Sequence, residues 1–131
     1  MGARNPELPS ELRAFLFTCI DSVDQLEVLL LLAAASRPLT VKDVAADTGG
    51  AEALARAHLE ALVARGLLRV QASGPTTYTC APRSADLQHY LDLLVSWHTS
   101  SKSLVVSFVV AHARGGLRGF SDAFKLRNED S

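Results

Sequence analysis

Cysteine is scarce in this chain of 131 residues, and its two copies lie far apart, at Cys19 and Cys80. Two widely separated cysteines form neither a disulfide framework nor a Cys-x-x-Cys site. We therefore expect two buried, reduced thiols. The first residues also lack the apolar stretch and the cleavage site of a secretory signal, so the expected location is the cytoplasm.

Long hydrophobic runs are missing as well. The two most apolar stretches, residues 28–35 and 104–111, are far shorter than the roughly 20 residues that cross a bilayer. We expect no membrane span and no membrane partner. Hydrophobic residues still make up 48% of the chain, which is enough for one compact core with extensions.

Neither sign of charge is in clear excess. The chain has 13 basic and 14 acidic residues, with a formal net charge of −1. A typical nucleic-acid-binding domain is more basic than this, so the charge balance alone does not favour a nucleic-acid partner.

The sequence also lacks the motifs of common catalytic sites. It has no glycine-rich phosphate loop, no nucleophile elbow and no pair of carboxylates at a recognisable spacing. Four histidines could suggest a metal site, but their spacing does not match one, and neither cysteine belongs to a thiolate pair. We therefore expect that the protein is not an enzyme and that it binds no cofactor and no metal ion. The histidines are His58, His89, His98 and His112.

Turn signals divide the chain into three regions with helical periodicity. Residues 1–21 form an N-terminal helical arm, with a helix that Ser10 caps and that runs to about Ile20. Residues 22–83 hold a compact unit, and residues 84–131 hold C-terminal helices that we expect to serve dimerisation.

The compact unit opens with two capped helices. Ser22 and Gln25 form an S-x-x-Q capping box for a helix that ends near Ser36. Thr40 begins the next helix, and Asp43 places a negative charge in its first turn.

A third helix and a hairpin complete this unit. After a turn at residues 47–50, the helix spans about 51–64 and ends at Gly66, where a left-handed residue is favoured. Two short β-rich runs, 67–71 and 76–80, surround a glycine-containing turn and predict a β-hairpin.

The C-terminal region begins with a long helix. Ser84 caps it, and it extends to about Ala111, with a polar stretch at 96–103 that could kink or break it. Gly115-Gly116 ends this element, and a short amphipathic helix follows. The expected fold is mostly α with a small β-hairpin.

Four features of the compact unit form a pattern. They are Leu39-Thr40 ahead of a short helix, the glycine turn at Gly49-Gly50, the run from Ala57 to Leu68, and the hairpin directly behind it. With these features, the stretch from Ser22 to Pro82 resembles the winged helix-turn-helix domain of ArsR-like and MarR-like bacterial transcription regulators. The resemblance implies a homodimer whose third helix lies in a DNA major groove.

The resemblance also implies site residues. DNA would be contacted by basic and hydroxyl side chains on the second and third helices and on the hairpin, namely Thr40, Lys42, Arg56, Arg69, Thr76 and Thr77. Many relatives place the dimer contact on the long helix after the hairpin. Its stripe for the dimer or the core comprises Leu87, Tyr90, Leu91, Leu94, Trp97, Leu104 and Phe108.

Two functions remain open. The first is a dimeric DNA-binding regulator. The second is a winged-helix module that binds protein, because the exposed side of the third helix carries Glu52, Glu60 and several alanines, which repel or ignore phosphate. In that case an apolar face around Leu54, or the C-terminal helix with Phe120 and Phe124, would dock on a protein partner.

Overall fold

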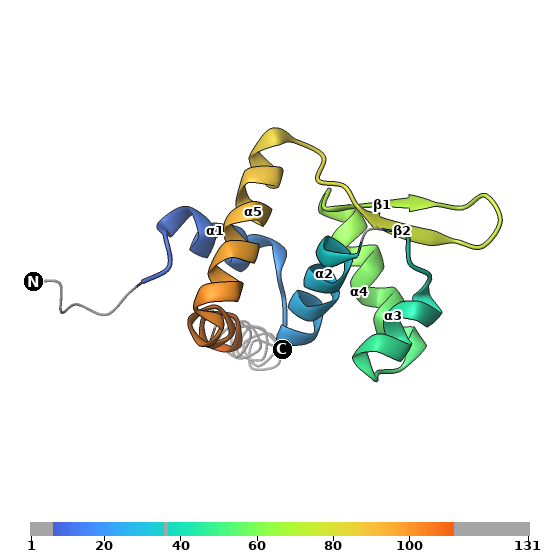
Figure 1. The fold of residues 1–131 in the computed structure, drawn as a ribbon, viewed down its shortest axis with the longest axis horizontal. Helices are drawn as coiled ribbons and strands as arrows, with labels where there is room; N and C mark the ends of the chain where they lie inside the picture. The colour runs from blue at the N-terminus through green and yellow to red at the C-terminus, as the bar shows by residue number, and fades with distance from the viewer. Residues whose placement is uncertain (1–6, 36, 112–131) are drawn as a thin grey trace, which may run out of the picture.

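The computed structural model describes residues 7–35 and 37–111. Helices dominate, and the one sheet among these residues is a two-stranded antiparallel hairpin, so the predicted winged helix-turn-helix fold is confirmed (Figure 1). The final short helix predicted after Gly115-Gly116 lies outside the described residues. The elements in chain order are α1 (Ser10–Cys19), α2 (Val23–Ala34), α3 (Val41–Thr48), α4 (Glu52–Ala64), β1 (Leu68–Gln71), β2 (Thr77–Cys80) and α5 (Ala85–Ser100), followed by the helix Lys102–Ala111.

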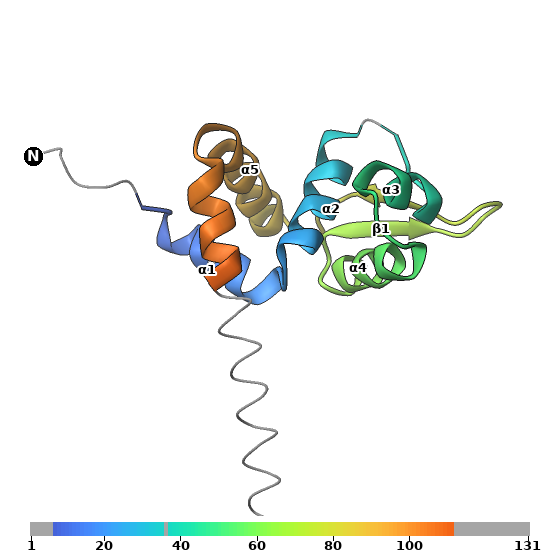
Figure 2. The same cartoon turned by 90° about the horizontal axis from the view of Figure 1, so that it is seen from below.

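These elements form two groups, which we call the winged layer and the arm layer. The winged layer comprises α2, α3, α4 and the hairpin, and the arm layer comprises α1, α5 and the Lys102–Ala111 helix. Figures 1 and 2 show the arm layer on the opposite side of α2 from α3, α4 and the hairpin. One core of buried side chains runs through both layers, from Leu12 in α1 to Val109 in the last helix.

The hairpin is anchored to the start of the helix-turn-helix. Its strands pair in the register Leu68 with Cys80 and Gln71 with Thr77. Leu39, just ahead of α3, exchanges two backbone hydrogen bonds with Tyr78 of β2, at N···O distances of 3.0 and 2.8 Å. The wing is therefore fixed at the base of α3, while its turn extends beyond the helices (Figure 1).

The helix caps confirm part of what the sequence predicts. Thr40 and Asp43 form a full capping box, because the Thr40 Oγ1 accepts from the Asp43 amide and the Asp43 carboxylate accepts from the Thr40 amide. These bonds, first of all the one from the Thr40 amide, hold the pKa of the Asp43 carboxyl below its ordinary value. The left-handed residue predicted at Gly66 is also confirmed, with a φ of 82°.

Two cap predictions are wrong in detail. Ser10 is the first residue of α1 rather than its cap, which is Pro9 and makes no side-chain cap bond. The Ser22 Oγ does accept from the Gln25 amide, but the Gln25 side chain does not return the bond to Ser22. Its Oε1 accepts from the Asp21 amide instead, at 2.8 Å, and it also accepts from the half-buried Arg65, as described below.

The long C-terminal helix breaks within the polar stretch that the sequence marks as weak. α5 ends at Ser100, and the Lys102–Ala111 helix turns by 115° relative to it. The Ser101 amide bonds to the last turn of α5, while its carbonyl accepts from the amides of Leu104 and Val105 in the next helix. None of the described helices is long and apolar enough to cross a membrane alone, and only these two, taken together across the bend, reach that length and composition.

Arg65, at the C-terminal end of α4, joins the two layers. Its Nη1 donates to the Cys19 carbonyl at 2.7 Å and to the Gln25 Oε1 at 2.9 Å, and its Nη2 forms an ion pair with Asp21 at 2.9 Å. Gln25 is 2% exposed. A buried amide oxygen costs free energy unless it is hydrogen-bonded, so Arg65 and the Asp21 amide together make the burial of Gln25 possible.

We predict that Arg65→Ala lowers the free energy of unfolding by about 2–3 kcal/mol, because it removes charge-assisted hydrogen bonds to partly buried acceptors. Arg65→Lys should cost less, since one ammonium group can serve some of these acceptors. Arg56→Ala, at an exposed position of α4, is the matched control and should change stability by less than about 0.5 kcal/mol. Urea titration followed by circular dichroism measures all three. Equal effects of Arg65→Ala and Arg56→Ala would contradict the prediction.

Candidate functional site

The outer side of α4 is the surface that a winged helix would present to DNA. The residues on this side are exposed, as the sequence predicts. The side chain of Leu54 is 54% exposed. The exposed set carries one positive and two negative charges among small and apolar side chains. It comprises Glu52, Ala53, Leu54, Arg56, Ala57 and Glu60.

The six predicted DNA contacts all lie in the winged layer. Lys42, Arg56, Arg69 and Thr76 are exposed, and Thr77 is half-buried. Thr40 is occupied as the cap of α3, so its hydroxyl oxygen already accepts one hydrogen bond. The basic side chains are spread over α3, α4 and β1, one on each element.

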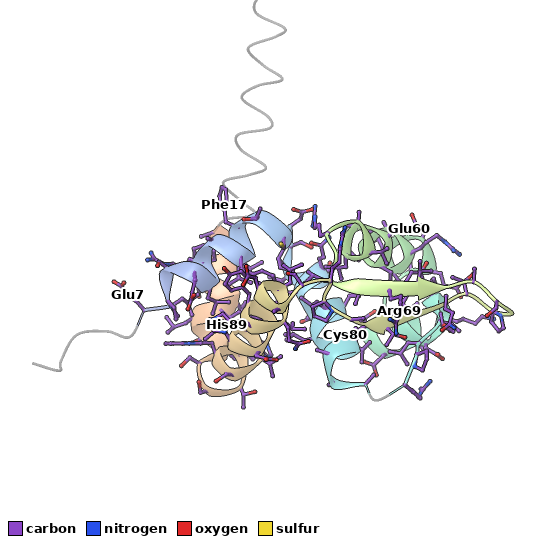
Figure 3. All side chains as sticks on the ribbon, turned by 90° about the horizontal axis from the view of Figure 1, so that it is seen from above. Glu7, Phe17, Glu60, Arg69, Cys80 and His89 are labelled. Atoms are coloured by element: carbon purple, nitrogen blue, oxygen red, sulfur yellow. The ribbon has the colours of Figure 1, made fainter. Side chains whose placement is uncertain are left out.

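The wing adds no charge to this surface. Residues 71–76, around its turn, are exposed and uncharged. In Figure 3 Glu60 and Arg69 lie in the winged layer, whereas Phe17 and His89 lie in the arm layer. The surface thus brings isolated basic groups close to carboxylates, and carboxylates oppose binding to phosphate.

The residues of the predicted dimer stripe fall into two sets that differ in burial. Leu91 and Leu94 are 3% and 0% exposed and belong to the core of the same protomer. The other five stripe residues are only half-buried, so they retain apolar surface. They are Leu87, Tyr90, Trp97, Leu104 and Phe108.

Two exposed apolar residues of the arm layer were missed by the sequence analysis. Phe17 on α1 is 65% exposed and Val95 on α5 is 39% exposed. Neither belongs to the stripe of residues that the sequence predicts for the dimer or the core. In the sequence each is a single apolar residue beside a polar helix face. Such residues are also common on surfaces that bind no partner, so they do not identify an interface.

An aromatic contact and a close approach of a histidine to a carboxylate hold the helices of the arm layer together. The rings of Phe15 and Tyr90 lie 5.8 Å apart between centroids, and the His89 Nε2 lies 3.5 Å from a carboxylate oxygen of Glu11. Both contacts join α1 to α5. The packing of α1 on α5 is therefore a property of the single chain.

An open groove of about 610 Å³ separates α5 from α2 and β2. Leu32, Cys80, Leu91 and Val95 line it, with Arg37 and Asp92 among its polar residues. Cys80 and Cys19 are free thiols and only half-buried, so the expectation that they are buried is met in part. Burial raises the pKa of both thiols, and for Cys19 the nearby Arg65 opposes this effect.

A second cavity, which we call the α2–α4 notch, has a volume of about 260 Å³. It lies where α2 faces the α3–α4 turn and the first half of α4. Asp24 and Glu27 from α2 line it together with Leu54 and His58 from α4. Within residues 7–35 and 37–111, no group of three or more histidine, cysteine, aspartate or glutamate side chains could hold a metal ion.

A third groove, of about 280 Å³, runs between α2 and the Lys102–Ala111 helix. Glu27, His98, Lys102 and Val106 are among the residues that line it. Burial lowers the pKa of His98, and the positive charge of Lys102 lowers it further, while Glu27 acts in the opposite direction.

Comparison with known proteins identifies both a family model and solved structures. The model described as the O-methyltransferase dimerisation domain matches residues 13–88, from within α1 to the first turn of α5. No curated protein sequence matches the chain. Among solved structures, human N-acetylserotonin methyltransferase in complex with SAM is 25% identical over 65% of this chain and 26% of its own, with a TM-score of 0.44. The chain thus spans about a quarter of that enzyme.

Two bacterial structures show the same fold. The homodimeric winged helix-turn-helix DNA-binding domain of a possible ArsR-family transcriptional regulator from Mycobacterium bovis is 21% identical, with a TM-score of 0.50. The match covers 76% of this chain and 94% of that one. The protein RV1404 from Mycobacterium tuberculosis is 13% identical over 92% of this chain and 84% of its own, with a TM-score of 0.51.

We predict that the protein loses stability as the pH falls below about 6.5, the ordinary pKa of histidine. The folded state lowers the pKa of His98, so the unfolded chain binds the proton more readily. The contribution is complete above pH 6.5 and is lost as the pH falls through the lowered pKa. Unfolding free energies at pH 7.5 and 5.5 should differ less in His98→Gln than in the wild type. An unchanged difference in His98→Gln would contradict this assignment.

Proposed function

Because this chain belongs to the O-methyltransferase dimerisation domain family, we propose that it is a dimerisation module that pairs with a second copy of itself through the arm layer. The family match supports this most directly. It begins within α1 and ends in α5, so it includes helices of the arm as well as the winged layer. The proposal assigns association, and no catalytic step, to these residues.

The apolar surface of the arm layer supports the same function. Leu87, Tyr90 and Trp97 are half-buried on α5, and Val95 is 39% exposed on the same helix. Burial of apolar surface contributes about 25 cal/mol per Å² removed from water. Burial of these side chains between two copies would therefore stabilise a dimer. Homodimer interfaces are commonly apolar in this way.

The exposed surface of the winged layer is poorly suited to bind DNA. Glu52 and Glu60 flank Arg56 on the exposed side of α4, and the turn of the wing offers no cation. Few counterions would be released on binding, and most non-specific affinity for DNA comes from that release. This favours the module that binds protein over the regulator that binds DNA.

We expect the full chain to be a dimer in light scattering and sedimentation velocity. The double variant Leu87→Lys with Val95→Lys should weaken the dimer at least tenfold, because two charged groups would be buried at the interface. The matched control is Leu54→Lys with Val70→Lys. It alters two exposed apolar residues of the winged layer, 54% and 44% exposed, and should leave the dimer intact.

Two results would argue against this assignment. The wild-type chain could be monomeric at about 100 µM, where even a weak dimer is populated. The control variant could dissociate as much as the arm variant. If the arm variant loses its helical circular dichroism, the milder substitutions Leu87→Ser with Val95→Ser take its place and should weaken the dimer in the same measurement.

A DNA-binding regulator is the second candidate. Lys42, Arg56 and Arg69 favour it, because they are exposed on α3, α4 and β1 of a fold that the Mycobacterium bovis DNA-binding domain shares. The carboxylates of α4 oppose it, as argued above.

We predict no mobility shift with duplex DNA at tens of micromolar protein and low salt, since this surface neutralises few phosphates. Arg56→Ala and the exposed Arg13→Ala on α1 serve as matched variants. A shift that falls with salt and is lost in Arg56→Ala alone would reverse the preference and support the regulator.

A further inference from the structure

The α2–α4 notch has an apolar floor. Val28 and Ala55, at 2% and 4% exposure, lie beneath it, and Leu54 forms an exposed apolar wall. Its volume of about 260 Å³ accommodates one or two large side chains. Of the exposed residues on the outer side of α4, only Leu54 also lines the notch.

The rim of the notch is acidic. Asp24 and Glu27 stand on α2 one turn apart, both exposed, and no lysine or arginine is among the described residues that line the notch. The remaining titratable side chain is the half-buried His58. A segment that fits must therefore combine an apolar side chain with neighbouring positive charges, because each charge near the rim then faces a carboxylate.

The chain itself contains a segment of this chemistry. Residues 112–127, beyond the described part, combine basic and apolar side chains with a single carboxylate, Asp122. The apolar residues follow one another at intervals of three and four, which is the spacing of anchors that dock in a groove. The basic residues are Arg114, Arg118, Lys125 and Arg127, and the apolar anchors are Leu117, Phe120 and Phe124.

The helix that precedes this segment packs beside α2, which also contributes to the notch. The Lys102–Ala111 helix lies along α2, since Lys102 and Val106 share a groove with Val23 and Glu27, and Glu27 also lines the notch. The 16 residues of the segment could span about 50 Å when extended. So short a tether gives a local concentration in the millimolar range, and Gly115-Gly116 provides backbone freedom for a reversal of direction.

We propose that residues 112–127 bind the α2–α4 notch of the same chain, with an apolar side chain against Leu54 and basic side chains beside Asp24 and Glu27. The segment then covers Leu54 at the edge of the outer side of α4. It would thus compete with a protein partner that docks around Leu54. This inference does not depend on dimerisation.

Carbodiimide coupling of the full chain tests the proposal, because it joins an amine to a carboxylate only at direct contact. The chain has three lysines, at positions 42, 102 and 125. We expect mass spectrometry to find Lys125 linked to Asp24 or Glu27. An equal mixture of ¹⁴N- and ¹⁵N-labelled protein should give links within one label only. The Asp24→Asn with Glu27→Gln variant should lose the link, and Asp86→Asn, an exposed change on α5, should keep it.

Hydrogen exchange gives an independent measurement. Phe120→Asp with Phe124→Asp removes the anchors and should speed amide exchange several-fold in residues 49–58, with α5 unchanged. Links from Lys125 to other carboxylates only, links between differently labelled copies, or no change in exchange would each overturn the proposal. Light scattering on the same sample separates this result from the proposed dimer, since same-chain links are expected in a monomer and in a dimer alike.

Discussion

One guanidinium group ties the two layers together at the point where the chain passes from one to the other. Arg65 sits at the end of α4 and reaches the junction between α1 and α2, where it serves a backbone carbonyl, a buried amide and a carboxylate. These acceptors belong to the segment at which the chain passes from the arm layer to the winged layer. Arg65, which caps the C-terminal end of α4, therefore helps the shared core to hold α1 against the winged layer, and α1 packs in turn on α5.

This constraint links the fold to the proposed function. A flexible arm would have to lose conformational entropy before it could pair with a second copy, whereas an arm already fixed within the chain brings a formed surface to the encounter. The aromatic contact between Phe15 and Tyr90 and the bridge between Glu11 and His89 act in the same direction. The arm thus behaves as part of one unit, in line with a family match that includes α1, the winged layer and the start of α5.

The parts of the fold that the sequence predicts are those specified by neighbouring residues. The Thr40–Asp43 box, the left-handed Gly66 and the hairpin each arise within a few positions, so local chemistry is sufficient to identify them. The role of Arg65 escaped prediction because its partners lie 40 to 46 residues away. The same distant partner explains why Gln25 does not complete its predicted box.

The candidate surfaces were predictable to a different extent. The acidic, alanine-rich side of α4 is visible in the sequence, and the structure confirms that it faces solvent. The division of the α5 stripe into buried Leu91 and Leu94 and half-buried neighbours required coordinates, because helical spacing alone does not tell which apolar face meets the protomer's own core. The notch required them too, since α2 and α4 bring Glu27 and His58 together from separate helices.

The bend at Ser101 has a consequence for assembly. A straight helix from residue 85 to 111 would be about 40 Å long and could pair with its symmetry mate as a rod, in which neighbouring registers differ by one heptad and compete. Two short helices meeting at 115° present a corner instead. In the proposed dimer, two copies that meet at this corner would have fewer alternative alignments than two straight helices.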